Sequence, residues 1–156
     1  MFIDTAKVYL KAGNGGNGVV SFYREKYIVK GGPDGGRGGN GGNIIFVGES
    51  GLTTLLDFHY KRKIVAQNGQ NGMGRNMYGA KGEDIYVKVP LGTVVTNLDT
   101  GQIIADITIH GQEVIVAKGG RGGRGNSFFA NSRHTTPDFC EKGEPGVEFN
   151  AGLELK

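Results

Sequence analysis

Two stretches of the chain decide the fold: residues 31–42, GGPDGGRGGNGG, and residues 119–125, GGRGGRG. In both, glycine recurs at every third position, and a second glycine series with the same spacing runs beside the first. Three residues per turn is the repeat of the left-handed polyproline II helix, which forms no internal hydrogen bonds. Such a helix must pair its backbone with neighbours, and glycine lacks the side chain that would hold those neighbours apart. The spacing therefore predicts a bundle of helices of this type.

Two further stretches, 13–18 and 69–82, share the spacing, and the four together hold 22 of the chain's 30 glycines. A flexible linker is the alternative, because ordering any backbone residue costs about 1–2 kcal/mol and glycine loses more freedom than others. The strict register and the absence of the serine that flexible linkers favour support an ordered bundle. We expect the following glycines to be structural: Gly32, Gly35, Gly38, Gly41, Gly79, Gly82, Gly119, Gly122 and Gly125.

Between the glycine stretches the sequence alternates apolar and polar residues, as half-buried strands do. Leu52–Tyr60 alone has helix-like spacing, enough for one or two turns. Gly92 ends the turn sequence Val89-Pro90-Leu91-Gly92, where glycine is favoured. The pattern predicts an all-β sandwich or barrel from which the glycine bundle projects. Strands are expected at 6–10, 19–23, 43–47, 63–66, 85–89, 93–96, 103–109, 114–116 and 147–155.

Length and composition set the class of protein. A chain of 156 residues suffices for one domain. Its single cysteine, Cys140, excludes an intrachain disulfide and is compatible with a reducing compartment. No apolar run approaches the ~20 residues of a membrane span, and the start MFIDTAKVYLK is unlike a signal peptide. We therefore expect a cytoplasmic protein.

The net charge is only +3, but the charges are unevenly distributed. Stretches 59–82 and 117–134 carry lysine and arginine without any acid, whereas acids predominate in 83–116 and 135–156. Basic residues thus gather in and beside the glycine stretches. This distribution favours a polyanionic partner that is bound by one end of the molecule. The alternative is a solvated surface on which the clustering is accidental.

The motifs of nucleotide and metal sites give no support for catalysis. The sequence has no GxxxxGK[ST] motif, and its GxGxxG match at 13–18 precedes an expected strand instead of a helix. The three histidines are far apart in sequence and lack paired cysteines, so no metal site is predicted. Lysines and arginines beside aromatic residues remain, a combination that binds phosphates and stacks on unpaired bases. Burial of the phenylalanines under the bundle is the competing interpretation.

Several long segments resemble the amino-terminal glycine-rich domain of the Obg GTPases. They are MFIDTAKVYLKAGNGGNGVVSFYREKY, GGPDGGRGGNGGNIIFV, GRNMYGAKGEDIYVKVPLGT, KGGRGGRGNSFFANS and EPGVEFNAGLELK. The resemblance covers residues 1–156 as one domain and implies the Obg fold, an eight-stranded β-barrel carrying the helix bundle. Its arm segments would lie near 13–42, 69–82 and 119–146. GTP, Mg²⁺ and hydrolysis would belong to a GTPase domain absent from this chain, so the chain itself is expected to be neither an enzyme nor a cofactor binder.

The resemblance also implies a function in ribosome assembly and in the stress (stringent) response. The domain would act as a monomer that docks on the large ribosomal subunit, with its loop tips in the rRNA of the peptidyl-transferase region. Those tips would lie near Arg24–Arg37, Arg75–Lys81 and Arg121–His134. A protein-interaction or self-assembly domain that regulates an attached enzyme is the alternative. The candidate rRNA-binding residues are Arg24, Lys26, Lys30, Arg37, Arg75, Lys81, Arg121, Arg124 and Arg133.

Overall fold

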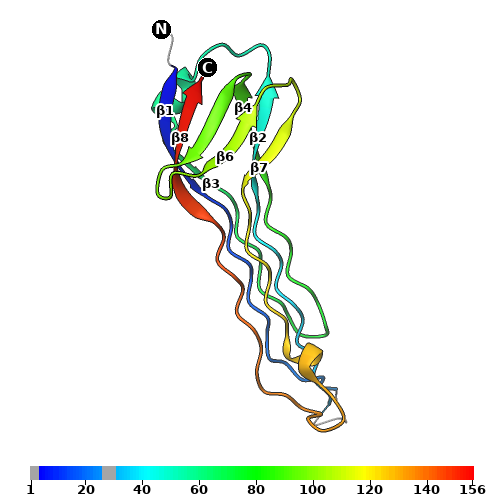
Figure 1. Ribbon diagram of the computed structural model, residues 1–156. Helices are drawn as coiled ribbons and strands as arrows, with labels where there is room; N and C mark the ends of the chain where they lie inside the picture. The colour runs from blue at the N-terminus through cyan, green and yellow to red at the C-terminus, as the bar shows by residue number, and fades with distance from the viewer. Residues whose placement is uncertain (1–3, 26–30) are drawn as a thin grey trace.

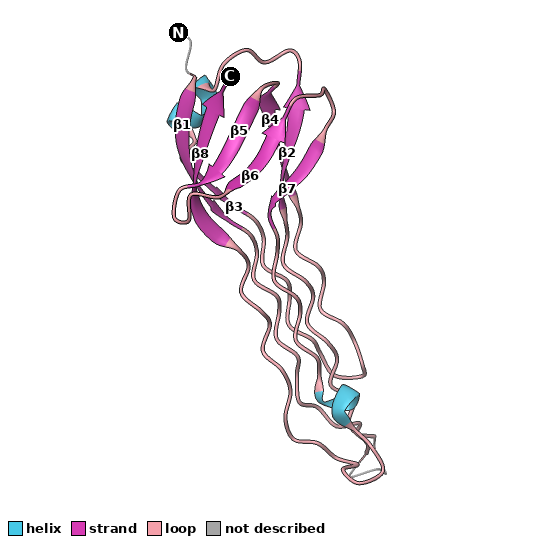
Figure 2. Ribbon diagram, in the orientation of Figure 1, coloured by secondary structure: helices cyan, strands magenta, loops and turns pink. Residues whose placement is uncertain are grey.

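A computed structural model describes residues 4–25 and 31–156 and divides them into a β-sheet head and a long arm (Figure 1). Figure 2 shows that the strands gather at one end of the molecule and that the arm is built from extended loops. No helix in the described ranges is both long and apolar enough to cross a membrane. The elements are β1 (Thr5–Lys11), β2 (Ile44–Glu49), α1 (Leu56–Tyr60), β3 (Lys63–Val65), β4 (Ile85–Pro90), β5 (Thr93–Asn97), β6 (Ile103–Ile107), β7 (Glu113–Ala117), the 3₁₀ turn η1 (Asn126–Phe129) and β8 (Glu148–Leu155).

The strands of the head form two sheets. The larger has the order β3-β1-β8-β5-β6 and the smaller the order β4-β2-β7. β1 runs parallel to β3 and antiparallel to β8, which places Val8 opposite Ala151. β2 runs parallel to β4 and antiparallel to β7. The predicted all-β class is thus confirmed, but among the described residues no hydrogen-bonded ladder closes the strands into a single barrel.

A hydrophobic core lies between the two sheets. The alternating residues of β1 and β8 turn Leu10 and Leu153 inward, and β2 contributes Phe46. Phe58 of α1 closes the core, with its ring 6.2 Å from that of Phe46. The short helix predicted from the spacing of 52–60 therefore covers this side of the core.

Two local predictions were wrong. Residues 19–23 form no strand, because their backbone enters the arm, and they contribute only an isolated bridge between Phe22 and Pro33. Gly92 is the third residue of its turn and not the last, since β5 begins at Thr93. Its φ of +90° is a conformation that side chains disfavour, and an added Cβ would lie 2.6 Å from the carbonyl oxygen of Lys156.

The arm consists of extended runs of chain joined to one another by backbone hydrogen bonds at every third residue. The central run 12–21 donates from Gly13 and Gly16 to the run 33–43, and from Gly15 and Gly18 to the run 140–147. The second central run, 33–43, donates to 66–74 and 118–126 and accepts from 77–84. N–H groups three residues apart in one run therefore donate to the same neighbouring run, as a helix with three residues per turn requires.

The arm glycines are required for close approach and not for unusual dihedral angles. The positive-φ glycines among the described residues are Gly92, Gly101 and Gly111, all in the head. A methyl group at Gly122 would instead overlap the carbonyl of Gly38, and one at Gly41 would overlap that of Gly13. The same holds for Gly35, Gly38, Gly79, Gly82, Gly119 and Gly125. Gly32 differs, because nothing lies within 4 Å of an added Cβ.

Candidate nucleic-acid interface

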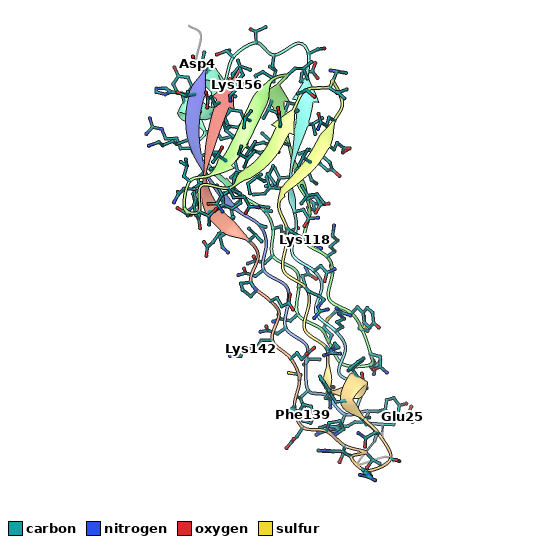
Figure 3. The ribbon with its side chains drawn as sticks, in the orientation of Figure 1. Asp4, Glu25, Lys118, Phe139, Lys142 and Lys156 are labelled. Atoms are coloured by element: carbon teal, nitrogen blue, oxygen red, sulfur yellow. The ribbon has the colours of Figure 1, made fainter. Side chains whose placement is uncertain are left out.

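The far end of the arm, which we call the tip, is formed by residues 20–25, 31–34, 73–78 and 126–140. In Figure 3 Glu25 and Phe139 lie at this end, Lys118 lies close to the head, and Lys142 lies part of the way along. The tip is anchored by Asn126, which is fully buried. Its side-chain oxygen accepts the N–H groups of Ser21 and Gly35, and its amide nitrogen donates to the carbonyl of Pro137. One asparagine thus joins three parts of the chain.

Arg75 is presented by a tight turn whose backbone is strained. Arg75 and Asn76 have φ angles of 60° and 56°, and the N–H of Met77 donates to the carbonyl of Gly74. These are the features of a type I′ turn, which usually needs glycine or asparagine at both central positions. Asp34 holds the turn from below, because its Oδ2 accepts the N–H of Arg75 at 3.0 Å and its carbonyl accepts that of Asn76.

Arg24 and Arg75 line the same hollow of the tip. Its other walls include Tyr23, Pro33 and Asp34. Both arginines are exposed, and neither side chain forms an ion pair among the described residues. Arg133, in the loop 126–140, is exposed in the same way. Three of the predicted cations therefore reach solvent at the tip without a described carboxylate partner.

Arg121 and Arg124 have carboxylate partners. Arg124 forms a two-pronged ion pair with Glu141, at 2.6 and 2.8 Å, and Arg121 lies 3.2 Å from Glu144. The hydrogen bonds from Arg124 lower the pKa of Glu141 to about 2. Residues 117–134 contain no acid in the sequence, but in the structure the acidic segment after residue 135 runs beside them and supplies carboxylates to their arginines.

The other predicted cations lie away from this exposed group. Lys81 pairs with Asp84 at 3.1 Å at the head end of the arm, where the N–H of Asn43 lowers the pKa of Asp84. Arg37 is half-buried within the bundle, where its carbonyl accepts the N–H of Gly79. Lys26 and Lys30 fall outside the described residues.

Aromatic rings cluster in the loop 126–140, beside Arg124. The rings of Phe128 and Phe129 meet edge to face, with their centres 5.3 Å apart. The ring of Phe139 lies 4.9 Å from that of Phe129 and 5.9 Å from that of His134. The guanidinium of Arg124 lies over the ring of Phe128, 4.2 Å from its centre. Phe128 and Phe129 come three and four residues after the glycine stretch 119–125 and were noted from the sequence. Phe139 and His134 were not predicted, because only the path of the loop brings them beside the other two.

A series of asparagines with the spacing of the glycines was also not predicted. Their side-chain oxygens accept the N–H groups that the backbone of a neighbouring run leaves free. Asn14 accepts from Gly146, Asn17 from Gly143 and Asn40 from Gly122. The pairs Asn14 and Asn17, Asn40 and Asn43, and Asn68 and Asn71 show this period of three in the sequence. That signal could have identified which faces of the runs meet.

Comparison with known proteins gives one consistent result. The family model described as GTP1/OBG matches residues 3–156. Over all 156 residues the chain is 58% identical to the GTPase Obg of Thermoanaerobacter sp. strain X514 and 56% identical to that of Clostridium beijerinckii. The GTPase Obg of Geobacillus kaustophilus is 55% identical. The chain spans only 36–37% of the length of these relatives.

Proposed function

Because the chain belongs to the GTP1/OBG family, we propose that it is the ribosome-binding domain of an Obg-type GTPase that docks on the large ribosomal subunit. The observation that carries the proposal is the exposure of Arg24, Arg75 and Arg133 at one end of a cross-linked arm. Cations held far from the head by a stiff support can reach phosphates inside a narrow site, which a flexible chain would reach only at a larger entropic cost. The resemblance supports the rRNA of the peptidyl-transferase region as that site.

The role in ribosome assembly and in the stringent response belongs to the same proposal, as do the cytoplasmic location and the monomeric state. The relatives that bear the name GTPase Obg are much longer than this chain. GTP and Mg²⁺ would therefore be bound outside residues 1–156. The chain would contribute binding and positioning, and the attached domain would contribute hydrolysis.

The test is the salt dependence of binding to purified large subunits, with small subunits as the control. Replacing Arg24, Arg75 and Arg133 with glutamine should lower the slope of log affinity against log salt by about 0.7–0.9 for each phosphate that is no longer neutralised. The matched control replaces Lys7, Lys61 and Lys88, three exposed cations of the head. Equal losses in both variants would show that only net charge is read, and no loss in either would overturn the proposal.

A protein-interaction domain is the second candidate, and one feature of the head favours it. Tyr86 and Ile115 flank Ile45 in one row across the smaller sheet, and both are more than half exposed. An apolar row of this kind suits a protein partner better than RNA. Self-assembly through the arm is less favourable, because its glycine backbones already hydrogen-bond to one another. Binding through the apolar row would persist at high salt, whereas binding to rRNA would weaken.

A further inference from the structure

The exposed phenylalanine of the anchored 3₁₀ turn η1 has no assigned role, and its surroundings indicate one. Phe128 is 60% exposed although it belongs to a ring cluster. Its backbone is fixed by the residues before it, because Asn126 is buried and the hydroxyl of Ser127 donates to the carbonyl of Gly35 at 2.7 Å. An exposed ring on so rigid a base loses little conformational freedom when it binds a flat partner.

Arg124 holds this ring in place and does not act as a free cation. Its guanidinium is fixed by two hydrogen bonds to Glu141, and the same group covers Phe128 at 4.2 Å. With its charge balanced by Glu141, Arg124 is poorly suited to neutralise a phosphate. It is well suited to brace the ring, since a planar guanidinium stacks on aromatic faces.

The surroundings of the ring favour a nucleobase over a phosphate. The loop 126–140 contains one arginine, Arg133, and one acid, Asp138, so its formal charge is balanced. Exposed cations, Arg24 and Arg75, nevertheless lie elsewhere at the tip, where they can bind phosphates of the same RNA. Aromatic platforms within a cationic groove are the usual means by which proteins bind unpaired nucleic acid.

We propose that Phe128, backed by Arg124, is a stacking platform for an unpaired base of the large-subunit RNA. The inference rests on the proposed function and adds to it the kind of RNA that the tip binds: a base that is not engaged in a duplex. Arg124, which the sequence grouped with the phosphate-binding residues, becomes a positioning residue for the ring.

Two variants separate stacking from electrostatic attraction. Phe128→Ala should weaken binding to large subunits about 5- to 150-fold, the range measured for stacked bases. It should leave the slope of log affinity against log salt unchanged, because no cation is removed. Arg133→Gln should change that slope. A Phe128→Ala variant with unchanged melting temperature and unchanged affinity would overturn the platform.

A fluorescent version of the ring reports the stacking directly, because the chain contains no tryptophan. In Phe128→Trp, emission should be quenched when large subunits are added, since a stacked base quenches indole. The matched control is Tyr86→Trp, a head position that is also 60% exposed and should not respond. Enhanced, blue-shifted emission at position 128 would mean docking on an apolar protein surface and would overturn the proposal.

The two proposals fail in different ways. If sedimentation shows salt-sensitive binding to large subunits while the emission at position 128 stays unchanged, the platform is wrong and the ribosome-binding function stands. If the wild-type chain does not sediment with large subunits at low salt, the proposed function is wrong and the platform is wrong with it.

Discussion

In the head, strands β1, β2 and β8 place large apolar side chains in a shared core, whereas in the arm most of the buried positions are glycines. Packed apolar side chains stabilise the head, whereas the absence of side chains at the arm glycines lets neighbouring backbones pack together. Backbone groups in the arm approach closely enough to hydrogen-bond at every third residue. The comparison teaches that one chain can use two kinds of interior: the loss of side-chain volume damages the head, and the gain of side-chain volume damages the arm.

The largest effect is expected in the head, from Phe46→Ala. Phe46 is fully buried against Phe58, so its removal should leave a cavity and destabilise the fold by about 3–5 kcal/mol. Denaturant unfolding of the head measures the change. A decrease below ~1 kcal/mol, well short of this range, would show that the core collapses around the gap and that the head depends less on its side chains than we argue.

Gly122→Ala applies the opposite change, the addition of one methyl group, to the arm. The methyl would overlap the carbonyl of Gly38, so neighbouring runs must separate, at a cost of about 3 kcal/mol. Hydrogen exchange should show reduced protection at Gly38 and Gly41, whose N–H groups donate to the run 118–126. Gly32→Ala is the matched control, because nothing surrounds that position, and it should change little. Equal effects of the two substitutions would contradict the close-approach account.

The two interiors also differ in how far they could be predicted from the sequence. Period-two alternation and short apolar runs predicted the eight strands that the structure describes, and the glycine period predicted the arm, because these patterns are local. Whether the sheets close was not foreseeable: β6 pairs with the preceding strand β5 and ends its sheet there, whereas β7 pairs with β2, which is distant in sequence. Residues 19–23, VVSFY, look like a strand because they are rich in β-branched and aromatic residues, which strands favour.

The candidate site was predictable in composition but not in geometry. The basic residues and Phe128 are visible in the sequence, yet Glu141 reaches Arg124 only because two arm runs pair in one register. Counting acids along the chain therefore overstated the free charge of the arm. Gly32 shows the converse limit: it keeps the spacing of the series, but it lies where the bundle has ended.

A smaller effect is expected at the tip, where Asp34 supports the strained turn. Asp34→Ala removes the acceptor of the Arg75 N–H, and an amide left without a partner costs about 1–3 kcal/mol. Asp34→Asn, which keeps an acceptor oxygen, should be much milder. Reduced protection at Arg75 and Asn76 in hydrogen exchange, with the head unchanged, would locate the effect in the arm.

A double-mutant cycle sharpens that prediction. Arg75→Gly lets the turn adopt its positive φ without strain, so it should restore part of the stability that Asp34→Ala removes. It should add less stability to the wild type, whose turn Asp34 already holds. Equal gains in both backgrounds would mean that Asp34 and the turn are independent, since the coupling energy would then be zero.

The smallest effect, and one that depends on pH, is expected from Glu141→Gln. The hydrogen bonds from Arg124 lower the pKa of Glu141 from 4.5 to about 2, so the folded arm favours the charged carboxylate. Such a group stabilises the fold fully above pH 4.5, and its contribution disappears as the pH falls from there through about 2. The melting temperature of the variant should therefore lie below that of the wild type at neutral pH, and the two should converge as the pH approaches about 2. Glu144→Gln is the control, because its ion pair with Arg121 is more exposed on both sides and should contribute less. A difference between wild type and Glu141→Gln that persists unchanged from neutral pH down to about pH 2 would show that the ion pair does not support the arm, and that backbone pairing alone, through the N–H of Glu141 and the carbonyl of Arg124, holds these runs together.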